Sequence, residues 1–61
     1  SNSGDGRVIM LFYIGDKRQP ENHFWNSLHG VASEQQIMML LDGMKITIGG
    51  VCYQILFENE E

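Results

Sequence analysis

Hydrophobic and polar residues alternate near the end of the chain, in the stretch KITIGGVCYQILF, residues 45–57. Because every second side chain of a strand points to the same face, this alternation predicts two β-strands. Gly49 and Gly50 separate the two runs, and a pair of glycines favours the two-residue type I′ turn of a β-hairpin. We therefore predict a hairpin whose turn sets the pairing of its strands.

The predicted turn determines which residues face one another. A two-residue loop gives these cross-strand pairs: Ile48 with Val51, Ile46 with Tyr53, and Met44 with Ile55. Alternation then gathers the large apolar side chains on one face, which carries Met44, Ile46, Ile48, Val51, Tyr53, Ile55 and Phe57. The other face carries Lys45, Thr47, Cys52 and Gln54. The apolar face requires cover from other elements.

A first helix is predicted between Pro20 and Gly30. Phe24, Trp25 and Leu28 recur there at helical spacing. Pro20 suits the first helical position, and Gly30 favours a helix end.

A second helix is predicted from the spacing of Ser33 and Gln36, which matches a capping box. Its wide apolar face carries Ile37, Met38, Leu40 and Leu41, and Gly43 ends it. We expect Met38 and Met44 to lie in the core, and Met39 to face outward.

The segment Arg7–Ile14 is rich in β-branched and aromatic residues and is followed by Gly15 and Asp16, so it predicts a strand. This strand is apolar on both faces: Val8, Met10, Phe12 and Ile14 on one, and Ile9, Leu11 and Tyr13 on the other. The stretch GDKRQ that follows is predicted to be a loop.

These elements predict an α+β domain over residues 7–58, in the order β-α-α-β-β, with a three-stranded antiparallel sheet and two helices on one face. Residues 1–6 are expected to be a flexible N-terminus or a remnant of an expression tag. Residues 59–61 are expected to form an acidic tail.

The first strand is expected to lie at an edge of this sheet, because the tight Gly-Gly turn makes the hairpin strands neighbours. A long apolar edge strand favours pairing with another chain. A second copy across a two-fold axis is the simplest partner, and it predicts a homodimer with Ile9, Leu11 and Tyr13 at the interface. A different protein, or flanking sequence, is the alternative.

Composition supports a partner and excludes several classes of function. A chain of 61 residues buries only about 60% of its unfolded surface, so added stability is expected from association. The net charge of −4 disfavours binding to nucleic acid or anionic membranes. The single Cys52 excludes an internal disulfide and fits a cytoplasmic setting. The longest apolar run, VIMLFYI, is too short to span a membrane.

No residues with a catalytic pattern are found, and we predict no enzyme activity, cofactor or metal. His23 and His29 are six residues apart, which is the wrong spacing for ligands on one helical face, and Cys52 is expected in a strand. Phe24 and Trp25 are assigned to the core rather than to base stacking, given the acidic charge.

Lys17 and Arg18 are the candidate site for a small ligand. They precede Pro20, and the free N–H groups of a helix N-terminus, with two cations, favour phosphate or carboxylate. Ordinary solvated loop charges are the competing interpretation.

The predicted function is a non-enzymatic protein-interaction or oligomerisation module. One alternative is a binder of a small anion or nucleotide through Lys17 and Arg18. A second is a small acidic inhibitor that occupies the nucleic-acid site of another protein, using Asp42, Glu58, Glu60 and Glu61.

Overall fold

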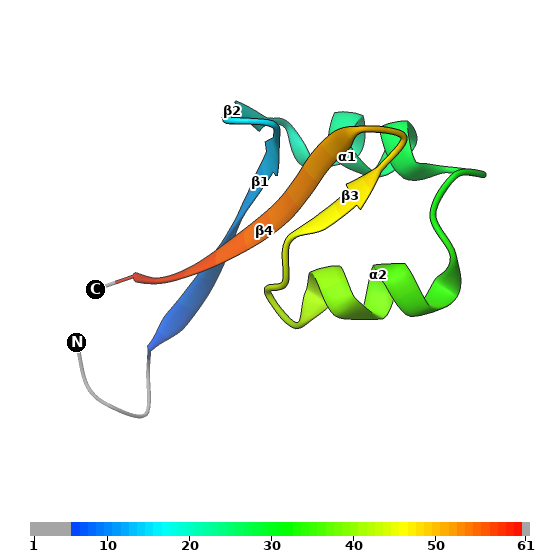
Figure 1. Ribbon diagram of the computed structural model, residues 1–61. Helices are drawn as coiled ribbons and strands as arrows, with labels where there is room; N and C mark the ends of the chain where they lie inside the picture. Colours follow the sequence, from blue (N-terminus) through cyan, green and yellow to red (C-terminus); the bar gives the residue numbers. More distant parts are fainter. Residues whose placement is uncertain (1–5, 61) are drawn as a thin grey trace.

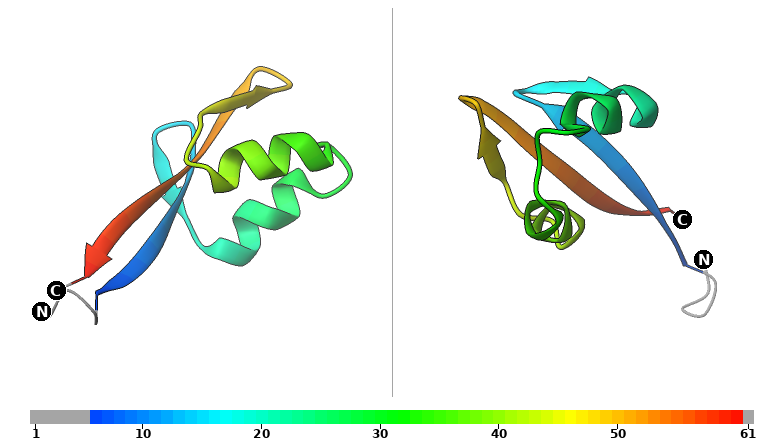
Figure 2. Two further views of the ribbon diagram at one scale, coloured as in Figure 1. Left: turned by 90° about the horizontal axis from the view of Figure 1, so that it is seen from below. Right: turned by 90° about the vertical axis from the view of Figure 1, so that its right-hand side faces the viewer.

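The computed structural model describes residues 6–60 and shows an antiparallel sheet with two helices packed on it (Figure 1). Its elements are β1 (Arg7–Ile14), β2 (Lys17–Gln19), α1 (Glu21–Leu28), α2 (Glu34–Leu41), β3 (Ile46–Ile48) and β4 (Val51–Glu60). The strand order is β2-β1-β4-β3. α1 packs on β1, and α2 packs on β3 and β4 (Figure 2). The predicted α+β class and the two helices are confirmed, and the sheet has four strands instead of three.

The additional strand, β2, lies in the segment that was predicted to be a loop. β1 and β2 form a hairpin in which Ile14 faces Lys17 and Phe12 faces Gln19. The turn between them is Gly15-Asp16, and Gly15 has a φ of 66°. A type II′ turn needs a positive φ only at its first central residue, which glycine supplies without strain. The strand was missed because its three residues are polar and show no alternation.

The second hairpin has the predicted turn. Gly49 and Gly50 both have positive φ values, 59° and 80°, as a type I′ turn requires. Two predicted pairs are confirmed: Ile48 with Val51 and Ile46 with Tyr53.

The third predicted pair, Met44 with Ile55, is wrong because β3 begins only at Ile46. Met44 instead lies in the segment that follows α2, and its N–H donates to the carbonyl of Met39 at 3.1 Å. Ile55 faces Phe12 of β1.

Hydrogen bonds at the ends of the helices match most of the predicted signals. Ser33 and Gln36 form both bonds of the capping box, at 3.1 Å and 2.9 Å, and so begin α2. At its end, the N–H of Gly43 donates to the carbonyl of Leu40 at 2.9 Å, which is part of a Schellman motif. Pro20 precedes α1 as its N-cap instead of occupying its first turn.

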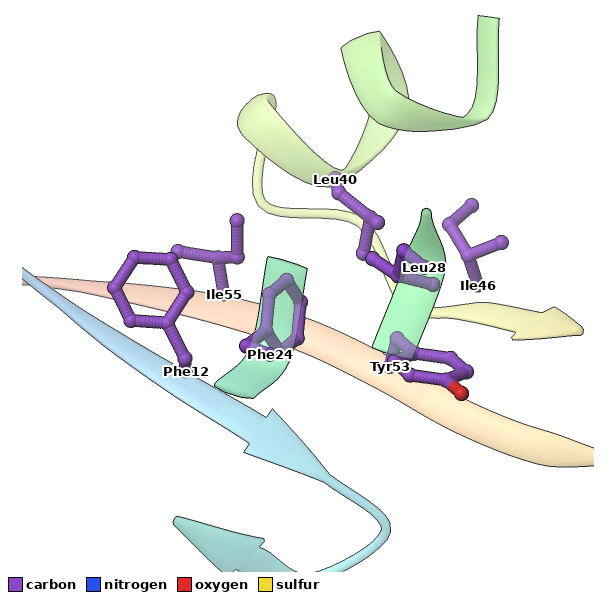
Figure 3. Packing of buried hydrophobic residues seen from close by; sticks show 7 residues of the cluster. All are labelled: Phe12, Phe24, Leu28, Leu40, Ile46, Tyr53 and Ile55. Carbon is purple, nitrogen blue, oxygen red and sulfur yellow. The ribbon is translucent and has the colours of Figure 1, made fainter. Parts of the chain in front are cut away.

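The core lies between the helices and the sheet, and Phe24 is at its centre. Phe24 is fully buried and projects from α1 between Phe12 and Tyr53 (Figure 3). Its ring centroid is 5.1 Å from those of Phe12 and Trp25 and 5.9 Å from that of Tyr53. The complete set of buried apolar residues is Phe12, Phe24, Leu28, Leu40, Ile46, Tyr53 and Ile55. Phe24 and Trp25 therefore belong to the core, as predicted.

The expected orientation of the methionines on α2 is wrong. Met38 is 63% exposed, whereas Met39 packs against the core, and Met44 is also exposed. Two residues correspond to a rotation of about 200° around a helix, which places Met38 almost opposite the fully buried Leu40.

Candidate functional site

The ends of β1 and β4 form a two-stranded ribbon that extends beyond the helices (Figure 2). β1 and β4 pair over their full common length, from Arg7 with Glu60 to Ile14 with Tyr53. Their outer neighbours are short, since β2 reaches only to Phe12 and β3 only to Tyr53. Residues 7–11 and 56–60 are named the ribbon arm below. The arm contributes to a long molecule, of 41 × 22 × 17 Å.

Both faces of the ribbon arm carry exposed apolar side chains. Val8 (60% exposed) and Phe57 (44%) lie on the face that continues the core side of the sheet. Ile9 (41%) and Leu56 (41%) lie on the opposite face, which the helices leave open. A two-stranded ribbon is only marginally stable in water without such surfaces being covered. Large contiguous apolar patches on a surface are typical of interaction sites.

The two edges of the arm differ in charge. The β1 edge carries one cation, Arg7, whose Nε lies 3.9 Å from Oε1 of Glu60. Both side chains are exposed, so this pair contributes little to stability. The β4 edge carries Glu58 and Glu60, which makes it acidic. The β1 edge therefore carries less like charge than the β4 edge.

Backbone groups of Val8 and Met10 point away from β4 at the β1 edge. The N–H of Gly15 donates to the carbonyl of Cys52 at 2.7 Å, which identifies this pair as hydrogen-bonded. In an antiparallel pair the bonding direction alternates along the strand, so the odd residues of β1 bond to β4 and the even ones point outward. β2 pairs with Phe12 and Ile14, but no strand among residues 6–60 pairs with Val8 or Met10.

The residues predicted to form a dimer interface lie together on the open face of the sheet. Ile9 and Leu11 belong to the ribbon arm, and Leu11 faces Leu56 on β4. Tyr13 lies further along β1, beside Arg18 of β2. β1 was expected to be an edge over its whole length, but β2 covers the part from Phe12 to Ile14. Only residues 7–11 retain a free edge.

Lys17 and Arg18 are neighbours on β2, so their side chains point to opposite faces of the sheet. Arg18 lines a pocket of about 490 Å³ at the start of α1, and Lys17 does not. The pocket is lined by Met10, Phe12, Arg18, Gln19, Pro20 and Glu21. Arg18 is the one cation and Glu21 the one carboxylate among these residues, and the pairing of Arg18 with Tyr13 directs the Arg18 side chain to the face opposite Met10 and Phe12.

The remaining candidate side chains are scattered. His23 and His29 are exposed at α1, and Cys52 is half-buried in β4. Within residues 6–60, no group of three or more His, Cys, Asp or Glu side chains is placed to hold a metal ion. A second pocket of about 320 Å³ lies between the helices and is lined by Trp25, Leu28, His29, Gly30, Ala32 and Ile37. It contains a single titratable group, so it offers no acid–base pair.

The acidic residues of the predicted inhibitor surface come from separate elements. Asp42 caps the end of α2, and Glu58 and Glu60 lie on the ribbon arm. Asn59 and Glu60, assigned to an acidic tail, belong to β4, and Glu61 lies outside the described residues. The predicted N-terminal segment, residues 1–6, also lies outside them except for Gly6.

Comparisons with family models, with curated proteins and with solved structures found no match to this chain. In the part of the chain that the structure describes, neither helix has the length and apolar character needed to cross a bilayer.

Proposed function

We propose that the protein is a non-enzymatic interaction module that forms a homodimer through the free β1 edge of the ribbon arm. The observation that carries this proposal is an edge segment, residues 7–11, whose outward backbone groups pair with no strand among residues 6–60 and whose apolar side chains lie on both faces. Exposed edges of this kind are templates for pairing with another strand. The single cysteine fits a cytoplasmic setting for such a module.

A second copy suits this edge better than it suits the edge of β4. A two-fold axis brings each edge against itself, so pairing along β4 would bring the glutamates of both copies together. Pairing along β1 joins mainly apolar residues and makes one continuous sheet from two copies. Dimerisation in this way would bury apolar surface that the small core of a single copy leaves exposed.

Leu11→Lys is expected to convert the dimer to a monomer. Leu11 lies at the inner end of the free edge, where a new charge loses apolar burial and meets the other copy. Light scattering at micromolar concentration should give twice the chain mass of 7.0 kDa for the wild type and the single chain mass for the variant.

Val51→Lys is the matched control, since Val51 is an exposed strand residue far from the arm, beside the Gly-Gly turn. It should remain dimeric, and circular dichroism should show that both variants are folded. A wild-type protein that stays monomeric at high micromolar concentration would contradict the proposed homodimer.

A second candidate function, the binding of a small anion, has one observation in its favour: Arg18 lines the pocket at the start of α1. Under this function, millimolar phosphate raises the melting temperature, with stabilisation that follows RT ln(1 + [L]/Kd). Arg18→Ala should abolish the rise, whereas Lys17→Ala should preserve it because Lys17 does not line the pocket. If phosphate does not raise the melting temperature, Lys17 and Arg18 are ordinary solvated charges.

A further inference from the structure

The pocket of about 490 Å³ lies where β2 stops and the free edge of β1 begins. Phe12 faces Gln19, the last residue of β2, and Met10 is the next outward-pointing residue of β1. The chain leaves the sheet at Pro20, which has no N–H to continue a ladder, and enters α1. Met10 and Phe12 therefore line the pocket on the side of the free β1 edge. A strand from another chain that pairs with this edge would approach the pocket from that side.

Only a few registers are possible for such a strand from a second copy. Hydrogen-bonded pairs must join even residues with even residues, because these point outward. A register centred on Met10 would pair Val8 with Phe12, whose outward groups already meet Gln19. The remaining registers that pair outward residues of β1 with one another are centred on Ile9, which pairs Val8 with Met10, or on Val8, which pairs Val8 with itself.

The pocket distinguishes these two registers. With Ile9 on the axis, Val8 of the second copy stands beside Met10 on the face that the pocket occupies. With Val8 on the axis, Gly6 of the second copy lies beside Met10, and glycine has no side chain to place in the pocket. Val8 is 60% exposed in the single chain, so it is free to enter the pocket of another copy. We infer that this pocket receives Val8 of a second copy, in a dimer that has Ile9 on its two-fold axis.

This inference rests on the proposed homodimer. It adds the register in which the two β1 strands pair and the residue, Val8, that fills the pocket of the other copy. The facing pairs across the seam are compatible in charge: Ile9 with Ile9, Val8 with Met10, and Arg7 with Leu11. No like charges oppose one another, and Arg7 keeps its neighbour Glu60 within its own chain. The exchange is reciprocal, so each copy both supplies Val8 and receives it, as two-fold symmetry requires.

Disulfide cross-linking of single-cysteine variants tests the register. In a Cys52→Ser background, Ile9→Cys should form a disulfide-linked dimer on mild oxidation. Residues facing one another in a non-hydrogen-bonded antiparallel pair have Cα atoms about 4.5 Å apart, within the range that a disulfide spans. Leu11→Cys is the matched control, because its two copies would be offset by four residues, about 13 Å, and should not cross-link.

The outcomes separate this inference from the proposed function. If the wild type is a dimer and Val8→Cys cross-links while Ile9→Cys does not, the register centred on Ile9 is overturned and the homodimer stands. A wild-type dimer in which neither variant cross-links overturns the inference as well, and places the interface elsewhere. If the wild type is a monomer, both the proposed function and this inference are wrong.

Val8→Asp tests the anchor in the pocket. The carboxylate would have to enter a site lined in part by Met10 and Phe12, so the dimer Kd should rise about ten-fold or more. Val31→Asp changes the chain's charge equally at a valine of similar exposure, 57%, in the loop between the helices, and should leave the Kd unchanged. Analytical ultracentrifugation measures both constants. Equal effects of the two variants, or no effect of Val8→Asp, would overturn the assignment of the pocket.

Discussion

Phe24→Ala is expected to remove a large part of the protein's stability at room temperature. Phe24 is fully buried, and its ring packs against Phe12, Trp25 and Tyr53. Truncation of a buried phenylalanine costs about 3–5 kcal/mol, through lost transfer energy and the cavity left behind. A chain of 61 residues has a total stability of roughly 3–9 kcal/mol, so this one change removes about a third of it or more. Urea denaturation followed by circular dichroism measures the loss.

Phe57→Ala is the control for this change, because it removes the same atoms from a side chain that is 44% exposed. Its ring lies beside Gly43, where an added Cβ would be 3.8 Å from Cε1 of Phe57. The loss of stability should be less than half of that for Phe24→Ala. Similar losses in the two variants would show that α1 does not supply the centre of the core.

Val at either position of the Gly-Gly turn is expected to produce the second-largest loss of stability. Gly49 and Gly50 hold φ values of 59° and 80°, a region that β-branched residues resist. Gly49→Val and Gly50→Val should each cost about 1–3 kcal/mol, since the turn cannot change without moving the register of β3 and β4. Thermal melts of the two variants should show the effect directly.

Gly49→Asn separates backbone strain from the mere addition of a side chain. Asparagine accepts positive φ and is favoured in type I′ turns, so this variant should melt close to the wild type. No atom lies within 4 Å of a Cβ added at either glycine, so crowding does not confuse the comparison. Valine variants as stable as the wild type would mean that the turn, and the pairs derived from it, are wrong.

A free edge on a small domain has a consequence for folding as well as for assembly. The ribbon arm makes few contacts with the helices, because α1 and α2 pack on the other ends of the strands (Figure 2). In a monomer the arm should open more readily than the core, and amide exchange should be fast at Val8 and Met10. Dimerisation along β1 would protect these two amides in particular, since they donate across the seam.

Local signals in the sequence determined the elements whose bonds close within a few residues. The Gly49-Gly50 turn, the Ser33–Gln36 capping box and the helix end at Gly43 each depend on neighbours in the chain, and each was predicted. The apolar face of β3 and β4 also followed from alternation, because a strand has only two faces. The apolar character of both faces of β1 also predicts Ile9 and Leu11 as interface residues, and that remains a prediction.

Tertiary structure alone decided how far each strand is paired. The turn at Gly15-Asp16 was readable, but the pairing of Lys17–Gln19 depends on β1 lying beside it, which polar residues do not reveal. The face that α2 turns to the core likewise depends on where the sheet lies, so the exposure of Met38 was missed. The site follows the same rule. Its free edge ends at Leu11 because β2 reaches Phe12, and its pocket exists because the chain leaves the sheet at Pro20.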